Sequence, residues 1–247
     1  MSINTESRAG DTDAAAIRST DLKVVVLDMA GTTVADDGLV LEAFDAAATV
    51  VGLPVAGAER EAARQYVLDT MGQSKIEVFR ALFGDEKRAQ TANTAFEKAY
   101  ENAIDGGVVA IAGAEAAITT LRDAGVRVVL TTGFSAGTQQ RILDALGWNE
   151  LADLVLAPGS GGRGRPYPDL VLNALLRMGI DDATLNDVAQ VAVVGDTGND
   201  VLSGRRAGAS IVVGVLTGAH DRDALLAAGA THVLDSVAEL PGLLLPS

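Results

Sequence analysis

The sequence predicts a doubly wound parallel α/β sheet into which a block of helices is inserted. Short apolar runs rich in valine recur at residues 23–28, 126–130, 191–194 and 211–215, and such runs are typical of strands buried on both faces. Helical patterns separate most of them, which favours parallel strands joined by helices. Between the first two runs, residues 39–104 show only helical spacing. We therefore expect a Rossmann-like core that carries an all-helical cap.

The composition is that of a globular chain with an acidic balance. The 247 residues are 48% hydrophobic, and the formal net charge is −14. This charge argues against binding to nucleic acid, which needs a basic face. The acidic balance is still compatible with a small anionic substrate, because a local site can be positive on an acidic protein. The chain has no cysteine, which excludes disulfides, thiolate metal sites and cysteine nucleophiles.

Nothing in the sequence predicts a membrane segment. No apolar run approaches the roughly 18 residues that a spanning helix needs. The first 20 residues are mostly polar and lack the apolar centre of a secretory signal. We expect no membrane association, a cytoplasmic location, and a flexible tail at residues 1–20.

The first strand and the cap follow from the order of patterns. The strand at residues 23–28 ends in Asp28, and a Gly-Thr-Thr turn comes soon after it. Helical spacing and terminal glycines predict cap helices at residues 39–51, 59–71, 75–83 and 86–104. Ser74 is the expected N-cap of the third helix. We assign residues 37–106 to the cap and residues 21–36 and 107–247 to the core.

The α/β alternation resumes after the cap. Helices are expected at residues 114–124, 136–146, 170–178 and 221–228, with a further helix that follows Asp200 and runs through Ala207, and strands at residues 126–130, 154–156, 191–194, 211–215 and 232–234. A glycine-rich loop at residues 158–164 precedes the third of these helices, at residues 170–178. The segments at residues 34–38 and 105–108, which join cap and core, are the expected hinges of a mobile lid.

Polar side chains follow several of the predicted strands, and they are the candidate functional residues. They are Asp28, Thr131 with Thr132, Arg165, and Asp196 with Asp200. All strands of a parallel sheet end at one edge, which is where ligands bind in open α/β folds. Residues far apart in the sequence are therefore expected to meet there.

Three carboxylates in one crevice would repel each other and raise each other's pKa. A hard divalent cation removes that cost, and ligation by oxygen alone suits Mg²⁺. The alternative is that Asp196 and Asp200 cap the helix that follows them. Arg165 offers a fixed positive fork for phosphate-type oxygens. Its alternative is a surface charge in a flexible loop.

Four segments, in this order, resemble the motifs of the haloacid dehalogenase superfamily, and more narrowly those of its phosphonatase branch. They are Asp-x-Ala-Gly-Thr from Asp28, Thr-Thr-Gly from Thr131, Gly-Arg-Pro-Tyr-Pro from Gly164, and Gly-Asp-Thr-x-x-Asp from Gly195. The resemblance covers about residues 22–217. Most members of the superfamily carry lysine where Arg165 stands, and the arginine marks the phosphonatase branch.

The resemblance implies a set of roles. Asp28 would attack phosphorus, and water would hydrolyse the resulting acyl phosphate. The Asp28 side chain, the Ala30 carbonyl oxygen and Asp196 would bind Mg²⁺, with Asp200 behind them or on a bridging water. Thr132, together with Thr131, and Arg165 would hold the phosphoryl oxygens. Gly133, Met71 and Gly72 are further candidates for substrate binding.

Ala30 stands where most phosphatases of this superfamily have an aspartate that protonates the leaving alkoxide. General acid help of that kind is worth about 10²–10⁴-fold. Phosphonatases activate the substrate differently, since a cap lysine forms a Schiff base with the substrate aldehyde. The segment Met71–Ile76 resembles the one that carries this lysine, so Lys75 is the candidate. Its alternative is an exposed lysine in the first turn of a helix.

Three departures from the phosphonatase pattern leave the substrate open. Val78 replaces a histidine, Phe134 replaces a tyrosine, and Ala35 replaces an aspartate, with Asp36 and Asp37 next to it. A phosphatase of a small phosphate monoester, using Asp28 and Mg²⁺ but not Lys75, is therefore the second hypothesis. A non-catalytic binding protein is the third. The resemblance also suggests a homodimer formed through the caps.

Overall fold

The computed structural model describes residues 22–36, 38–105, 107–159, 162–180 and 182–246, so the tail predicted at residues 1–20 lies outside the described residues. Within them, one parallel sheet has the strand order β3-β2-β1-β4-β5-β6. Its strands are β1 Val24–Asp28, β2 Arg127–Thr131, β3 Leu154–Leu156, β4 Val191–Gly195, β5 Ile211–Val215 and β6 His232–Leu234. The predicted parallel α/β core is confirmed.

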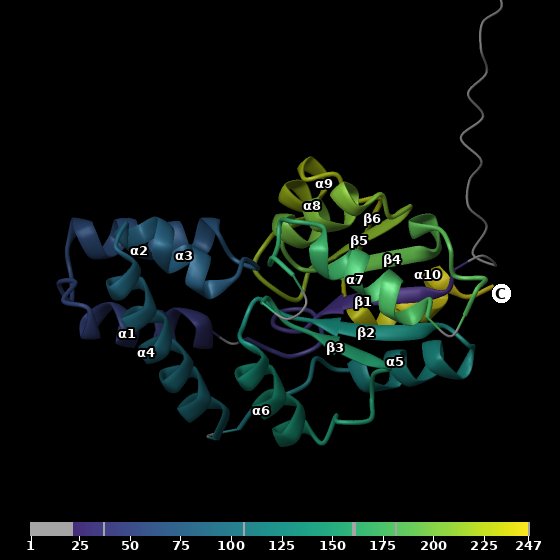
Figure 1. Ribbon diagram of the computed structural model, residues 1–247, viewed down its shortest axis with the longest axis horizontal. Helices are drawn as coiled ribbons and strands as arrows, with labels where there is room; N and C mark the ends of the chain where they lie inside the picture. The colour runs from purple at the N-terminus through teal and green to yellow at the C-terminus, as the bar shows by residue number, and fades with distance from the viewer. Residues whose placement is uncertain (1–21, 37, 106, 160–161, 181, 247) are drawn as a thin grey trace, which may run out of the picture.

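Helices cover both faces of the sheet (Figure 1). On one face lie α5 Ala114–Asp123, α6 Ala136–Leu146 and α10 Leu240–Leu244, and on the other α7 Asp169–Met178, α8 Gly198–Ala207 and α9 Arg222–Ala227. Two short 3-10 helices, η2 Val188–Gln190 and η3 Val237–Glu239, complete the core. The sheet is therefore the middle of three layers.

Strand β1 is buried along its whole length because both faces of the sheet are covered. Val25 and Leu27 point into the hydrophobic core that α5, α6 and α10 cover, whereas Val24 and Val26 point into the core on the other face. Full burial of each such side chain stabilises the fold by about 1.5–3 kcal/mol. This burial fixes the register of β1, and with it the position of Asp28.

Four helices between β1 and β2 form the cap, which stands beside the sheet on the left of Figure 1. They are α1 Leu39–Val50, α2 Ala58–Asp69, α3 Lys75–Phe83 and α4 Glu86–Asp105. The all-helical insertion is confirmed. Its predicted limits stay a prediction, since residues 37 and 106 lie outside the described residues. Ser74 is the N-cap residue of α3, but its side chain makes no capping hydrogen bond.

An aromatic cluster forms the centre of the cap and joins it to the core. It contains all five phenylalanines of the chain and one tyrosine, namely Phe44, Phe79, Phe83, Phe96, Phe134 and Tyr100. Phe134 comes from the core, and its ring centroid lies 4.4 Å from that of Tyr100 on α4. Such ring contacts add to the free energy of apolar burial. The cap therefore rests on the core through apolar packing.

The two chain segments that connect cap and core run side by side. Val34 forms an antiparallel bridge with Ala110, and the backbone N–H of Ala35 donates to the Val109 carbonyl at 2.9 Å. Val34 is fully buried. The chain is therefore held by the core up to Ala35, and the hinge motion expected near this point stays a prediction.

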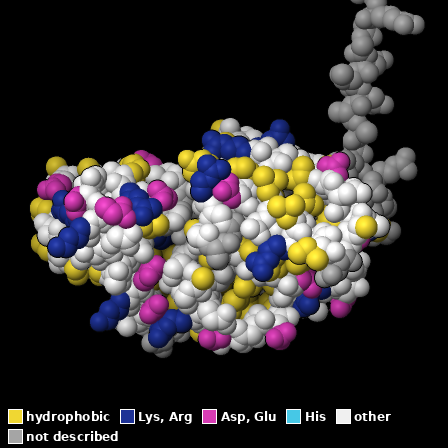
Figure 2. Space-filling model, in the orientation of Figure 1, with side chains coloured by type: hydrophobic (Ala, Val, Ile, Leu, Met, Phe, Trp, Pro, Cys, Tyr) yellow, Lys and Arg dark blue, Asp and Glu magenta, His cyan; other side chains and the backbone are white. Residues whose placement is uncertain are grey.

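Among the described helices none is long and apolar enough to cross a membrane. On the face shown in Figure 2, basic side chains lie among acidic ones and do not gather into one patch.

Candidate active site

The strand register brings the predicted residues to one edge of the sheet. Asp28, the last residue of β1, pairs with Thr131, the last residue of β2. On the other side Leu27 pairs with Val194 of β4, so that Asp196 follows at the same edge. The convergence expected from a parallel sheet is present.

Asp28, Asp196 and Asp200 form a compact carboxylate cluster. Each offers an oxygen that lies within 4.8 Å of the others, and all three side chains are buried. Burial raises the pKa of Asp28 well above its ordinary value, although Arg165 opposes this, and the charges of Asp200 and Asp196 raise it further. Burial and the charge of Asp200 raise the pKa of Asp196 to about 7.

Arg165 lies against this cluster and is itself buried. Its Nη2 lies 2.7 Å from Asp28 Oδ1, and its Nε lies 2.6 Å from Asp200 Oδ1. Nη2 also donates to Thr131 Oγ1 at 2.6 Å. Burial opposes the charge of the guanidinium, but the carboxylates outweigh it and raise the pKa of Arg165. The interpretation of Arg165 as a mobile surface charge is therefore wrong.

The two carboxylates after β4 have different partners. Asp196 accepts a hydrogen bond from the Thr32 hydroxyl at 3.1 Å and one from the Ala219 N–H at 2.8 Å. Asp200 Oδ2 accepts from the Thr197 N–H at 3.1 Å, in a capping box at the start of α8. The capping alternative therefore holds for Asp200, whose second oxygen faces Arg165, and fails for Asp196.

The donor set fits a divalent cation. Three buried carboxylates face one buried guanidinium, which leaves an excess of negative charge in a place where uncompensated charge is costly. Asp200 Oδ1 is buried and has no hydrogen-bond partner, since its close contact with Arg165 Nε is not aligned as a hydrogen bond. Carboxylate oxygens are the ligands that Mg²⁺ prefers in proteins. The cluster is thus suited to a metal such as Mg²⁺.

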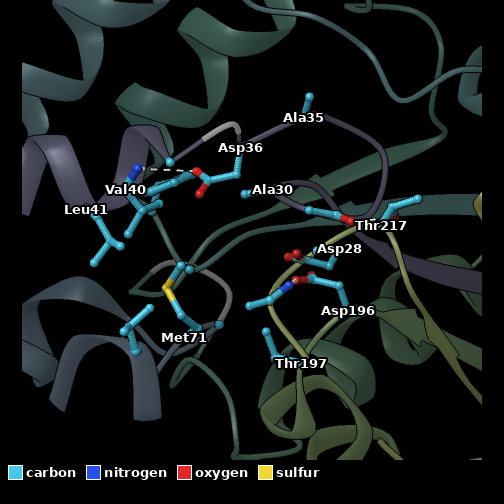
Figure 3. A pocket seen from close by; sticks show the side chains of 18 of the residues that line it. Asp28, Ala30, Ala35, Asp36, Val40, Leu41, Met71, Asp196, Thr197 and Thr217 are labelled. Atoms are coloured by element: carbon cyan, nitrogen blue, oxygen red, sulfur yellow. Dashed lines mark hydrogen bonds between the residues drawn. The ribbon is translucent and has the colours of Figure 1, made fainter. Parts of the chain in front are cut away.

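A cavity of about 320 Å³ opens between this cluster and the cap (Figure 3). Its polar floor includes Asp28, Asp196 and Arg165. The other walls are largely apolar, and they include Ala30, Val40, Leu41, Leu68, Met71, Ile111 and Phe134. The cavity is therefore large enough for a small molecule with one anionic end.

Lys75 enters the cavity from the cap. The residue is buried, with only 8% of its surface exposed, and Nζ lies 5.4 Å from the centroid of the Phe134 ring. The backbone N–H of Lys75 donates to the Gly133 carbonyl at 3.2 Å. Burial lowers the pKa of Lys75, and the charges of Asp36 and Asp28 partly offset this effect. The alternative of an exposed lysine is wrong.

The cap loop before Lys75 touches the core so closely that glycine is required on both sides. A Cβ at Gly133 would lie 2.6 Å from the Gln73 carbonyl oxygen. Gly72 has φ +83°, and a Cβ there would collide with the Thr197 hydroxyl. The side-chain amide of Asn199 also donates to the Met71 carbonyl at 2.7 Å. This contact places Lys75 relative to Asp28.

The cavity lining separates the predicted site residues into two groups. Eight of them line it, namely Asp28, Ala30, Met71, Gly72, Lys75, Gly133, Arg165 and Asp196. Thr131, Thr132 and Asp200 are buried next to these residues but are not among the lining. The Thr131 hydroxyl donates to the Leu27 carbonyl at 3.2 Å, and the Thr132 hydroxyl accepts from the Phe134 N–H at 3.2 Å.

Sequence reasoning assigned no role to two groups near the site. Asp36 lines the cavity. In the sequence it stands out only as an acid next to Ala35, which replaces an aspartate of the phosphonatase pattern. The Thr217–Ala219 loop also lines the cavity, and the Thr217 hydroxyl donates to the Gly31 carbonyl at 2.7 Å. It follows β5 with no ionisable residue, so its sequence carries no signal.

A parallel sheet with helices on both faces, a helical cap after its first strand and a buried carboxylate cluster at the strand ends defines a capped Rossmann-like protein. Comparison with known families identifies the family to which it belongs. The model of the haloacid dehalogenase-like hydrolases matches residues 22–208, and the chain belongs to that family.

Curated relatives carry two kinds of name. A "Probable phosphatase IndB" of Dickeya dadantii is 25% identical over 89% of this chain and 92% of its own. A "Phosphonoacetaldehyde hydrolase" of Parabacteroides distasonis is 28% identical over 67% of this chain and 70% of its own. A protein of the same name from Bordetella pertussis is 34% identical, and the match covers 54% of this chain and 55% of that protein.

Solved structures share the fold. A hydrolase from Pseudomonas syringae has a TM-score of 0.76 at 22% identity, with 89% of this chain and 96% of that chain covered. A phosphonoacetaldehyde hydrolase-like protein from Oleispira antarctica has a TM-score of 0.75 at 23% identity, with 91% of each chain covered.

Proposed function

We propose that the chain is a Mg²⁺-dependent hydrolase that cleaves the C–P bond of a small phosphonate bearing an aldehyde. The observation that carries this proposal is the buried lysine that shares a cavity with the carboxylate cluster. Burial lowers the pKa of Lys75, which increases the fraction of neutral, nucleophilic amine near pH 7. The named phosphonoacetaldehyde hydrolases among the relatives support the same assignment.

The proposed reaction divides between the two sides of the cavity. The Lys75 amine condenses with the aldehyde, which releases water and forms an iminium. Asp28 then attacks phosphorus, and the electrons of the C–P bond move to the iminium to give an enamine. Water hydrolyses the phosphoaspartate, and protonation and hydrolysis of the enamine release the aldehyde product and free Lys75.

Ala30 supports this route because of what it lacks. It lines the cavity next to Asp28, and its methyl group cannot protonate a leaving group. An alkoxide is a poor leaving group without such help, which is worth about 10²–10⁴-fold. The iminium makes the carbon a better leaving group, so no acid is needed at position 30.

The remaining predicted residues have supporting roles in this proposal. Asp28, the Ala30 carbonyl, Asp196 and Asp200 would hold Mg²⁺, which supplies charge neutralisation for the attack on phosphorus. Arg165 and Thr132 would bind the phosphoryl oxygens, and Thr131, held by Arg165, would orient that guanidinium. Gly133, Met71 and Gly72 would form the wall that faces the substrate. A homodimer through the caps is a further prediction.

A phosphatase of a small phosphate monoester is the second candidate. It is favoured by a relative that matches 89% of the chain and is named a probable phosphatase. Val78 and Phe134 also depart from the phosphonatase pattern. In this case Asp28 and Mg²⁺ would act without Lys75.

A substrate panel with three variants decides between these functions. Phosphonoacetaldehyde and small phosphate monoesters are assayed with the wild type, Lys75→Arg, Asp28→Asn and the control Lys98→Arg. Arginine keeps the positive charge but cannot form the imine. We expect Lys75→Arg to lose about 10³-fold or more on the phosphonate, whereas exposed Lys98→Arg changes little. Borohydride should trap an adduct on Lys75.

Unchanged turnover of phosphonoacetaldehyde by Lys75→Arg contradicts the Schiff-base route. Ester hydrolysis that survives in Lys75→Arg but not in Asp28→Asn assigns the phosphatase function. Activity toward both substrates should vanish in Asp28→Asn. Activity that persists in this variant would show that Asp28 is not the nucleophile.

A further inference from the structure

We propose that Asp36 is the acid–base residue that moves protons to and from Lys75, an inference that rests on the proposed Schiff-base function. Asp36 lies on the short segment between β1 and α1, and it lines the same cavity as Lys75. Its Oδ1 accepts a hydrogen bond from the Val40 N–H at 3.3 Å, which holds the side chain at the start of α1. Figure 3 shows the carboxylate at the roof of the cavity, with Met71 and Asp28 below it.

Among the ionisable groups of the cavity, Asp36 is the one best placed to exchange protons with Lys75. Among the described lining residues, the ionisable side chains are Asp28, Asp36, Asp196, Lys75 and Arg165. Asp28 is paired with Arg165, and it must remain ionised to attack phosphorus. Asp196 is held by the Thr32 hydroxyl and the Ala219 N–H. Asp36 is the carboxylate on the cap side, outside the cluster.

The electrostatics of Lys75 agree with this placement. Burial lowers the pKa of Lys75, and the charges that act against burial come from Asp36, Asp28 and Asp196, while Arg165 acts with it. The effect of Asp36 is the largest of these charges. Val78, one helical turn after Lys75, is buried, and its aliphatic side chain cannot donate or accept a proton. Among the residues that line this cavity, an acid–base group for Lys75 therefore comes from the side opposite α3.

The proton balance of imine formation gives Asp36 two steps. First its carboxylate takes one proton from the Lys75 ammonium, which leaves a neutral amine. The amine adds to the aldehyde carbon, and proton transfer from nitrogen to oxygen gives a neutral carbinolamine. Protonated Asp36 then donates to the carbinolamine hydroxyl, which leaves as water while the C=N bond of the iminium forms. Asp36 ends as the carboxylate with which it began.

Timed trapping of the imine tests this role directly. Wild type, Asp36→Asn and Asp36→Glu are mixed with phosphonoacetaldehyde, quenched with sodium borohydride, and the mass added at Lys75 is measured on peptides. Asparagine still offers an oxygen to the Val40 N–H, so the start of α1 is kept. We expect trapping about 10²–10⁴-fold slower in Asp36→Asn and a partial recovery in Asp36→Glu. The control Glu42→Gln removes an exposed charge of α1 and should trap like the wild type.

A second readout does not depend on the substrate. The pH dependence of Lys75 acetylation by acetic anhydride reports its pKa, and Asp36→Asn is expected to move the midpoint to lower pH because a stabilising negative charge is lost. Equal trapping rates in Asp36→Asn and wild type overturn the proposal, as does an unchanged labelling midpoint. A wild type that forms no adduct contradicts the Schiff-base function itself, which separates the two failures.

Discussion

The two sides of the cavity are built in different ways. The core side consists of buried charges at the ends of strands, where Arg165 contacts both Asp28 and Asp200. The cap side consists of apolar walls and an aromatic cluster, to which one buried amine, Lys75, and one carboxylate, Asp36, are added. The core side is therefore defined mainly by the placement of charges, and the cap side mainly by its shape and by apolar burial.

This difference separates reaction from substrate choice. Buried charges tolerate little change, because the loss of one partner leaves another uncompensated. The core side is thus suited to one invariant task at phosphorus. An apolar wall can change shape at a modest cost when volume is conserved. The cap side is suited to choosing the organic part of the substrate, and the predictions below test this division.

Removal of divalent cations should have the largest effect, and it acts on the core side alone. We expect a chelator to reduce turnover by about 10³-fold or more, because several kcal/mol of charge stabilisation are lost, and Mg²⁺ to restore it. Without metal the pKa of Asp196 is raised to about 7. Protons therefore compete with the cation below that pH, and affinity should fall about tenfold per pH unit there.

Calorimetric titration with Mg²⁺ at pH 6, 7 and 8 measures this dependence. Equal Mg²⁺ affinity at pH 6 and pH 8 would contradict the assignment of a raised Asp196 pKa to this site.

Gly133→Ala should have the next largest effect, because it disturbs the contact between the two sides. The new Cβ would lie 2.6 Å from the Gln73 carbonyl oxygen and 3.0 Å from that of Gly72. Backbone atoms cannot move aside alone, so the loop that carries Lys75 must shift. A displacement of about 1 Å can cost about 10²-fold in rate, and overpacking costs about 1–3 kcal/mol of stability.

Gly137→Ala is the matched control, since a Cβ there has only Ser135 Oγ nearby, at 3.8 Å. It lies in α6 and should stabilise the helix by about 0.5–1 kcal/mol with activity unchanged. Steady-state kinetics and urea unfolding compare the two variants. If Gly133→Ala is as active as Gly137→Ala, the close approach of the cap loop does not set the position of Lys75.

The fold and the core side of the site were predictable because they depend on local patterns. Valine-rich runs marked the strands, and a parallel sheet necessarily brings Asp28 and Asp196 to one edge. The short helix α10 was not predicted, since Leu240–Leu244 contains a proline and a glycine. Its burial against the sheet, shown by Leu240 and Leu244, outweighs this weak local preference.

The cap side was less predictable because it depends on how separate helices approach each other. Nothing in the spacing of Tyr100 and Phe134 indicates that their rings meet. Asp36 lines the cavity, and no local pattern in the sequence indicates that it does. Asp200 shows a further limit, because helix capping and a place in the metal-binding cluster were treated as alternatives, and two oxygens on one carboxylate allow both.

Tyr100→Phe should have the smallest effect, and it tests whether the cap side is held by apolar packing alone. The Tyr100 hydroxyl is buried and has no hydrogen-bond partner among the described residues. Burial and the charges of Asp36 and Asp28 raise its pKa. An unpaired buried hydroxyl costs about 1–3 kcal/mol, so its removal should stabilise the protein by about 1 kcal/mol in urea unfolding, with turnover unchanged. Half-buried Tyr66 can reach water, and Tyr66→Phe should change stability by less than about 0.5 kcal/mol. A loss of stability or turnover in Tyr100→Phe alone would mean that this hydroxyl has a polar role, and that the cap is not held to the core by apolar packing alone.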